Sequence, residues 1–248
     1  MQTEMCVIAF AAQKGGVGKT TLAGHVAVAA HLSGMGPVGL IDMDPQGSLL
    51  RWWEGRSIEG LCLFQSAQGT IAQALQEAAR AGMRLVIVDT PPAITRAISD
   101  VVAQSDIVIV PTRPSPHDLR AVGPTVDIAE WHEKPLIFVV NGATARARIT
   151  SDAAVALSQH GTVAPVIIHH RVDFAASMID GRTVMESKPA GKSAIEIESL
   201  WNYLAGRIGR LQATSVDPAS ADNFGARVPT NLNALGRRVP VFGRRPGL

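Results

Sequence analysis

Short apolar runs recur along this chain with room for about one helix between successive runs, and this alternation constrains the fold more than any other feature. The runs are continuous rather than alternating, which is typical of strands buried on both faces of a parallel sheet. They occupy residues 5–11, 38–42, 84–89, 106–111, 135–141 and 162–169. Helix-like segments lie between and after them, at 19–33, 69–82, 95–104, 117–132, 150–160, 171–180 and 192–210. The pattern predicts an α/β fold with a mostly parallel, twisted sheet and helices on both faces.

Residues 1–211 carry this pattern and predict a single domain. The chain has 248 residues, of which 46% are hydrophobic, so it is long enough to bury a sizeable core. After residue 211 the chain has no sustained helical or strand period, and five arginines accompany two aspartates from Ala213 onward. Such a segment buries too little apolar area to offset its ordering entropy. We therefore expect residues 212–248 to be a flexible, arginine-containing tail, which is either a recognition peptide or without function.

The composition of the chain says little about its binding partners, but its cysteines and apolar runs indicate a cellular compartment. The net charge of +2 does not indicate a nucleic-acid binder, so any affinity for DNA must come from a local patch. Cys6 and Cys62 lie in apolar stretches without CxxC spacing, and we expect both to be buried thiols in a reducing compartment. No secretory signal is present, and no apolar run reaches the roughly 18 to 20 residues that span a bilayer. These features predict a cytoplasmic protein without a membrane partner.

A glycine-rich stretch, AAQKGGVGKTT at residues 11–21, joins the first apolar run to the first helix. In this setting, backbone N–H groups and a helix N-terminus cradle phosphates. The common pattern GxxxxGK[ST] would place glycine where this chain has Gln13, so the loop is a variant. Lys19 is expected to reach the β- and γ-phosphate oxygens, and the Thr20 hydroxyl to bind Mg²⁺. The expected phosphate-binding residues are Lys14, Gly15, Gly16, Val17, Gly18, Lys19, Thr20 and Thr21.

The second lysine of the loop, Lys14, precedes the glycines, so its side chain would leave the loop away from the nucleotide of its own subunit. A cation there is useful if an anion arrives from outside. A two-fold dimer that sandwiches two nucleotides would place each Lys14 on the phosphates of the opposite subunit. The alternative is a solvated surface lysine.

Acidic residues follow two of the apolar runs. Asp42 and Asp44 come at the end of the run 38–42, and Asp89 ends the run 84–89. The carboxyl ends of parallel strands share one sheet edge, where active sites of open α/β sheets lie. Carboxylates near a triphosphate would repel it unless they hold Mg²⁺ or water. For Asp42 and Asp44, a turn-forming, strand-capping pair is the alternative.

Three motifs occur in order: KGGVGKTT at 14–21, IDMDPQGS at 41–48 and VDTPP at 88–92. Over residues 5–210 the chain resembles the deviant Walker A ATPases of the ParA/MinD group, and PQG points to the Soj-like ParA partition branch. The resemblance implies a P-loop NTPase fold, ATP and Mg²⁺ as cofactors, and an ATP-dependent homodimer in which Lys14 acts across the interface. It implies that Asp44 positions the attacking water, that Asp42 lies near the metal, and that Asp89 binds magnesium through water. For Asn141 it implies a contact with adenine, and a plain turn at the strand end is an equal alternative.

The partition branch also implies an output. Its members bind DNA without sequence preference as ATP dimers, are released when a ParB-like partner stimulates hydrolysis, and so move a plasmid, chromosome or protein cargo over the nucleoid. The residues that would neutralise DNA phosphates are Arg171, Arg182, Lys188 and Lys192, with solvated surface charge as the alternative. The chain begins shortly before its first expected strand, so we expect no N-terminal helix-turn-helix and no sequence-specific reading of DNA.

Other outputs on this scaffold fit less well or stay open. An electron donor of this group needs cluster-ligating cysteines after Asp89, whereas Cys6 and Cys62 both precede it. A MinD-like membrane ATPase should end in a basic amphipathic helix, and Pro240 and Pro246 break such a period in the tail. A nucleotide-switched adaptor that docks on protein instead of DNA remains an alternative. The adjacent His169 and His170 and the pair Trp52 and Trp53 are interpreted as structural.

Overall fold

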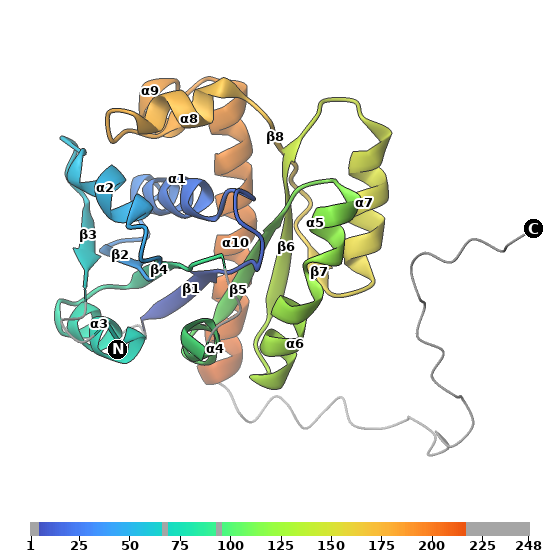
Figure 1. Cartoon of the computed structure of the whole chain (residues 1–248). Helices are drawn as coiled ribbons and strands as arrows, with labels where there is room; N and C mark the ends of the chain where they lie inside the picture. Colours follow the sequence, from blue (N-terminus) through green and yellow to red (C-terminus); the bar gives the residue numbers. More distant parts are fainter. Residues whose placement is uncertain (1–4, 66–68, 93–95, 217–248) are drawn as a thin grey trace, which may run out of the picture. The chain divides into compact units, whose positions relative to one another are not determined.

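The computed structural model describes residues 5–65, 69–92 and 96–216, without the side chains of 214–216 (Figure 1). The chain divides into residues 1–212, called the first unit below, and residues 213–248, and the first unit carries the fold described here. The last helix, expected to end at residue 210, continues to Val216. The predicted tail from residue 212 therefore begins inside this helix, and its remainder from residue 217 lies outside the described residues. None of the helices in the described ranges is both long and apolar enough to cross a membrane.

An eight-stranded sheet forms the centre of the first unit, with the order β3-β2-β4-β1-β5-β6-β7 and β8 paired to β6. All of these strand pairs are parallel. The strands are β1 Cys6–Phe10, β2 Val38–Asp42, β3 Leu61–Phe64, β4 Leu85–Asp89, β5 Ile107–Thr112, β6 Leu136–Ala143, β7 Thr162–Val163 and β8 Ile168–His169. The helices are α1 Lys19–Leu32, α2 Ser48–Glu54, α3 Ile71–Arg80, α4 Arg96–Ala103, α5 Pro116–Arg120, α6 Gly123–Trp131, α7 Arg148–Ser158, α8 Val172–Met178, α9 Val184–Ser187 and α10 Lys192–Val216.

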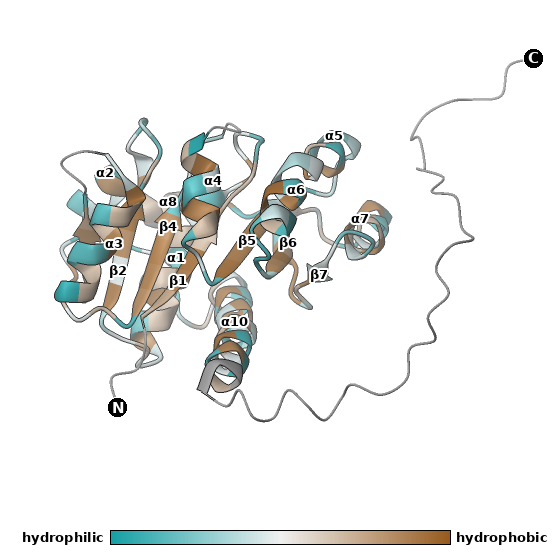
Figure 2. Cartoon of the chain, turned by 90° about the horizontal axis from the view of Figure 1, so that it is seen from below, coloured by the Kyte–Doolittle hydropathy of each residue, from teal (hydrophilic) through white to brown (hydrophobic). Residues whose placement is uncertain are grey.

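Helices cover both faces of the sheet, which confirms the predicted fold class. In β1, Ile8 and Phe10 point to a core shared with α1, α2, α8, α9 and α10, whereas Val7 and Ala9 point to a core shared with α3 and α4. A third cluster joins β5 and β6 to α4, α6 and α7. Figure 2 shows the central strands in the brown of hydrophobic residues. Because apolar side chains leave both faces, the strand runs carry no alternating pattern.

Three expectations about elements were wrong. The stretch 48–64 was not expected to hold elements, yet it forms α2 and the edge strand β3, in which Leu61 is buried and Cys62 exposed. Cys62 is therefore not a buried thiol, whereas Cys6 is buried. The predicted strand 162–169 is two short strands, β7 and β8, and the predicted helix 117–132 is divided into α5 and α6. Pro165 and Pro124 lie at these divisions, where a proline lacks the N–H that a ladder or helix needs.

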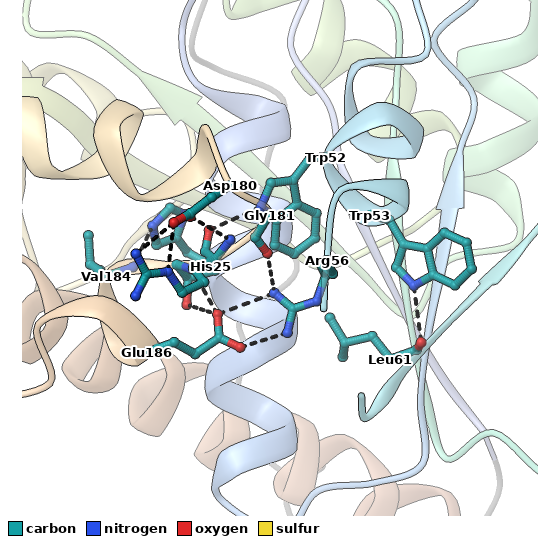
Figure 3. Close-up of polar contacts among 11 residues, drawn as sticks. His25, Trp52, Trp53, Arg56, Leu61, Asp180, Gly181, Val184 and Glu186 are labelled. Carbon is teal, nitrogen blue, oxygen red and sulfur yellow. Dashed lines mark hydrogen bonds and ion pairs between the residues drawn. The ribbon is translucent and has the colours of Figure 1, made fainter. Parts of the chain in front are cut away.

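A buried ion pair ties the segment after α2 to α9 (Figure 3). Arg56 Nη2 lies 2.6 Å from Glu186 Oε1, and the two side chains are 4% and 8% exposed. The guanidinium also donates to the Gly181 carbonyl at 2.7 Å and lies 4.9 Å from the ring centroid of Trp52. Glu186 accepts from the Thr183 N–H as part of a capping box. This arrangement holds α9 against the segment that follows α2.

Replacing Glu186 with alanine should lower the free energy of unfolding by about 3–5 kcal/mol, because it leaves the buried Arg56 charge without its carboxylate. Urea unfolding followed by circular dichroism measures this change. The control is Asp152→Ala, which breaks a 3.9 Å pair with Arg148 whose side chains are 64% and 93% exposed. That control should change stability by less than about 0.5 kcal/mol. Equal small effects in the two variants would contradict a structural role for the buried pair.

Candidate nucleotide site

The glycine-rich loop lies between β1 and α1, and two of its glycines adopt conformations that other residues reach only with strain. Gly16 has φ 72° and Gly18 has φ 96°, both in the left-handed region. A Cβ on Gly18 would also collide with the side-chain amide of Asn141. Gly18 is the N-cap of α1, and no side chain caps that helix end. Its first backbone N–H groups are therefore free of side-chain partners, which is the arrangement that binds phosphate.

Lys19, the first residue of α1, is buried and turns back over the loop. Its Nζ donates to the carbonyl oxygens of Ala12 at 3.3 Å and Lys14 at 3.4 Å. Burial lowers the pKa of Lys19, and the nearby carboxylates of Asp89 and Asp44 partly oppose this effect. Two long contacts to neutral carbonyls compensate a buried ammonium poorly. A phosphate in the loop would complete its coordination, as the sequence predicts.

Thr20, Asp42 and Asp89 lie close together, as their prediction as metal residues requires. Asp42 and Asp89 are Cα partners at the carboxyl ends of β2 and β4. Thr20 Oγ1 donates to Asp89 Oδ2 at 2.5 Å. Asp89 is fully buried, and its Oδ1 has no hydrogen-bond partner among the described residues. Burial raises the pKa of Asp89 to about 7, with the Thr20 hydrogen bond acting in the opposite direction.

These donors fit a magnesium ion. A buried carboxylate with an unused oxygen and a raised pKa is stabilised by a nearby cation. In the described part of the chain, no three His, Cys, Asp or Glu side chains gather into a cage that could hold a metal. Mg²⁺ does not need such a cage, since it keeps several waters and binds through one or two protein oxygens together with substrate phosphates. Thr20 and Asp89 would hold it, with Asp42 beside them.

Asp42 and Asp44 have different surroundings. The Asp42 carboxylate accepts from the N–H of Asp44 at 3.0 Å and the N–H of Leu50 at 2.9 Å, so it holds the DPQG turn and the start of α2. The capping alternative therefore describes Asp42. Among the described residues, the Asp44 carboxylate accepts only from the N–H of Gln46, at 2.9 Å, and Asp44 lines the cavity beside the phosphate loop. Asp44 is thus the carboxylate that can meet a ligand.

Lys14 has a partner that the sequence did not reveal. Its Nζ lies 3.0 Å from Asp118 Oδ2, and the two side chains are 41% and 5% exposed. The Ser115 hydroxyl donates to the same carboxylate, and Asp118 Oδ1 is buried without a hydrogen-bond partner in the described ranges. Lys14 therefore already meets an anion within its own chain, besides any that a second copy would bring. Its side chain does leave the loop, toward the turn after β5.

A cavity of about 440 Å³ adjoins the loop. This volume lies in the range of small-molecule sites. Its walls include the loop glycines and Lys19, and on the far side residues from the end of β6 and from the β8–α8 connection, among them Asn141, His169, Arg171 and Phe174. Asn141 Nδ2 donates to the Val17 carbonyl at 2.6 Å, so it also fastens the loop. Asn141 therefore lines the cavity, and its adenine contact stays a prediction.

A family model described as the CobQ/CobB/MinD/ParA nucleotide binding domain matches residues 8–184, well over half of the chain. The chain belongs to this family. This confirms the resemblance to the ParA/MinD group, and the matched residues include the glycine-rich loop.

Individual relatives and structures agree with this assignment. Maintenance of carboxysome distribution protein A of Halothiobacillus neapolitanus is 28% identical over 205 residues, which cover 79% of this chain and 94% of that protein. The protein of the same name from Gloeobacter kilaueensis is 43% identical over 122 residues, covering 48% and 55%. The structure of the septum site-determining protein MinD of Pyrococcus horikoshii with Mg-ADP matches with a TM-score of 0.69 at 16% identity, covering 84% of this chain and 99% of that one. The last likeness concerns the fold alone.

The basic residues predicted to bind DNA lie on one stretch of this ParA/MinD domain, from residue 171 to 192, and three of them are paired. Arg171 makes two hydrogen bonds to Glu196, at 2.6 and 2.7 Å, which raise the pKa of Arg171. Arg182 pairs with Asp180 at 2.6 Å, and Lys188 with Asp173 at 2.8 Å. Lys192 is exposed at the start of α10 and has no carboxylate within 4 Å among the described residues. The pairing reduces the positive charge of this stretch.

The structural interpretation of Trp52 and Trp53 agrees with their contacts, whereas His169 and His170 line the cavity and their interpretation as structural stays a prediction. Trp52 is buried and its Nε1 donates to the Arg182 carbonyl at 3.1 Å, while Trp53 Nε1 donates to the Leu61 carbonyl at 3.0 Å. His169 Nδ1 lies 2.7 Å from Glu196 Oε1, so it joins the Arg171 pair. Sequence reasoning did not find the cavity residues Gln46, Ser48 and Arg113. The glutamine follows Asp44 in the quoted IDMDPQGS motif, whereas the place of Arg113 depends on the strand order.

Proposed function

We propose that this protein is an ATPase that dimerises on ATP, binds DNA without sequence preference as a dimer, and positions a cargo through partner-stimulated hydrolysis. The observation that carries the proposal is the division of the two loop lysines. Lys19 is buried in the loop, whereas Lys14 leaves it and is 41% exposed. In the proposed dimer, Lys19 would serve the nucleotide of its own chain and Lys14 the phosphates of a second copy.

The chemistry proposed is in-line attack of water on the γ-phosphorus, with cleavage of its bond to the bridging oxygen to give ADP and phosphate. Asp44 orients the water, Lys19 holds β- and γ-oxygens, and the backbone of the loop positions the chain of phosphates. Mg²⁺ held near Thr20 and Asp89 would neutralise charge on the phosphate oxygens. Intrinsic turnover should be slow, since the dimer has to persist until a partner acts.

The names of the relatives support a role in positioning a cargo, but they do not agree on one kind of cargo. Two are named for carboxysome distribution, and others are named ParA and the chromosome-partitioning ATPase Soj. A plasmid, a chromosome or a protein assembly therefore fits, with an activating partner bound to it. In this proposal the protein is cytoplasmic and associates with the nucleoid when ATP is bound.

An adaptor that docks on protein instead of DNA is the second candidate. It is favoured by the pairing of Arg171, Arg182 and Lys188 with carboxylates, because DNA phosphates would have to displace these partners. A gel shift with random-sequence DNA, with ATP, ADP or no nucleotide, separates the two. DNA retarded with ATP alone supports the first candidate. Unretarded DNA under all three conditions, with an intact ATP dimer, supports the adaptor.

The basic stretch gives a further test. Replacing Lys188 and Lys192 with glutamine should weaken binding to all DNA sequences alike, because these residues would neutralise phosphates. Each subunit of the dimer loses two cations. If all four contact phosphates, the slope of log affinity against log salt should become less negative by roughly 3.6, about 0.9 for each cation. The control is Arg80→Gln, an exposed change at the end of α3 on the other face of the sheet. Unchanged affinity and slope would move the DNA surface elsewhere.

A further inference from the structure

Among the cations of the cavity wall, Arg113 differs from the others in the contacts of its side chain within the described residues. Lys19 donates to loop carbonyls and Arg171 is paired with Glu196. Arg113, which follows β5, lines the same cavity, yet it makes no ion pair or side-chain hydrogen bond with any described residue. A guanidinium carries five donors and keeps its charge at any physiological pH. An unpaired guanidinium beside a phosphate loop is therefore available for a phosphate.

The side chain of Arg113 lies between the phosphate loop and the end of β6. A Cβ built on Gly16 would lie 3.9 Å from Arg113 Nη2, so the guanidinium is next to the loop. A Cβ built on Gly142 would lie 3.6 Å from Arg113 Cγ and 3.7 Å from its Nε. Both glycines line the cavity. The guanidinium end of Arg113 is thus the end nearer to Gly16.

The strand order puts Arg113 opposite the acidic residues. In the sheet, β1 lies between β4 and β5, with β2 beyond β4. Phosphates on the loop after β1 would therefore have Asp89 and Asp42 on one side and Arg113 on the other. Gly16 is also the part of the loop away from Thr20 and Thr21, which belong to the first turn of α1. If the helix N-terminus takes the phosphates nearer the ribose, the terminal phosphate lies toward Gly16.

We propose that Arg113 contacts the terminal phosphate of ATP bound in its own chain and so makes the site favour ATP over ADP. This rests on the proposed function only in taking ATP as the ligand. The role differs from that of Lys14, which acts on the nucleotide of the other subunit. A charge-assisted hydrogen bond from arginine to phosphate, formed with the triphosphate alone, would also stabilise charge that develops as the terminal phosphoryl group leaves.

The test is calorimetric titration of Arg113→Gln with the non-hydrolysable analogue AMPPNP and with ADP, each with magnesium, at protein concentrations where the chain is monomeric. We expect about a tenfold loss of affinity for AMPPNP and less than a twofold loss for ADP, since one charge-assisted hydrogen bond is removed from the triphosphate complex alone. Arg113→Lys should recover part of the loss. The matched control is Arg120→Gln, an exposed arginine on α5 outside the cavity, which should bind both nucleotides as the wild type does.

Unchanged AMPPNP affinity in Arg113→Gln would overturn the proposal, and so would equal losses for AMPPNP and ADP, which would place the contact away from the terminal phosphate. Retained ADP binding shows that the variant is folded. Neither a dimer nor DNA is needed for this measurement. A protein that fails the gel shift can still show the selective loss, so the failure of the proposed function and the failure of this inference are distinguishable.

Discussion

Replacing Lys14 with alanine should abolish the proposed ATP-dependent dimer while the protein still binds ATP. Lys14 is the loop cation that leaves its own site, so in the proposed dimer its removal would take a positive charge from the phosphates of the opposite subunit. Truncating one partner of a buried charge pair at an interface costs about 2–5 kcal/mol, and a two-fold dimer loses two such contacts. We expect the dissociation constant of the dimer to rise more than about a hundredfold. Light scattering on size-separated protein with AMPPNP and magnesium measures the mass directly.

The contact between Lys14 and Asp118 suggests a second variant with the opposite expected effect. To reach the other subunit, Lys14 must leave a carboxylate that is 5% exposed, which costs free energy because the buried charge loses its partner. Asp118→Asn keeps the size of the side chain and removes the charge, so we expect its ATP dimer to form at lower protein concentration. Lys134→Ala, in the connection between α6 and β6, is the control and should dimerise normally. A dimer of wild-type affinity in Lys14→Ala would leave no role for this lysine across an interface.

Much of the fold could be predicted because its strands are buried on both faces. A continuous apolar run such as that of β1 is recognisable without knowledge of its neighbours. The missed elements lack this signal. β3 is a four-residue edge strand with one buried residue, and α2 spans seven residues, too few for a period to stand out. The break between β7 and β8 has a single signal in the sequence, a proline within an otherwise apolar run, and the prediction of one strand over 162–169 passed over it.

The candidate site could be predicted where its residues are neighbours in sequence. The loop, the DPQG turn and Asp89 belong to short motifs with local chemistry. The contact of Lys14 with Asp118 joins residues 104 apart, and that of Asn141 with Val17 joins residues 124 apart. Arg113 reaches Gly16 because β5 lies beside β1 in the sheet. Strand order decides these contacts, and the spacing of motifs along the chain does not encode it.

Replacing Asp44 with alanine should trap the protein as an ATP dimer on DNA. Asp44 lines the cavity and, within the described ranges, its carboxylate accepts only from the N–H of Gln46, so little of the fold depends on it. If it orients the attacking water, its loss should slow hydrolysis about 10²–10⁴-fold, the usual contribution of a group that assists proton transfer. Nucleotide binding should persist, because the loop and Lys19 are untouched. Phosphate release and dissociation from immobilised DNA after ATP is washed away measure the two effects.

Two other aspartates separate this role from a general loss of charge. Asp42 accepts from two backbone N–H groups and holds the start of α2, so Asp42→Ala should lower stability as well as activity. Asp100, exposed on α4, should tolerate alanine in both measurements. If Asp44→Ala left DNA as fast as the wild type while hydrolysis was slowed, release would not depend on hydrolysis. The cargo cycle would then need a different trigger, because a switch that opens without turnover cannot time its own release.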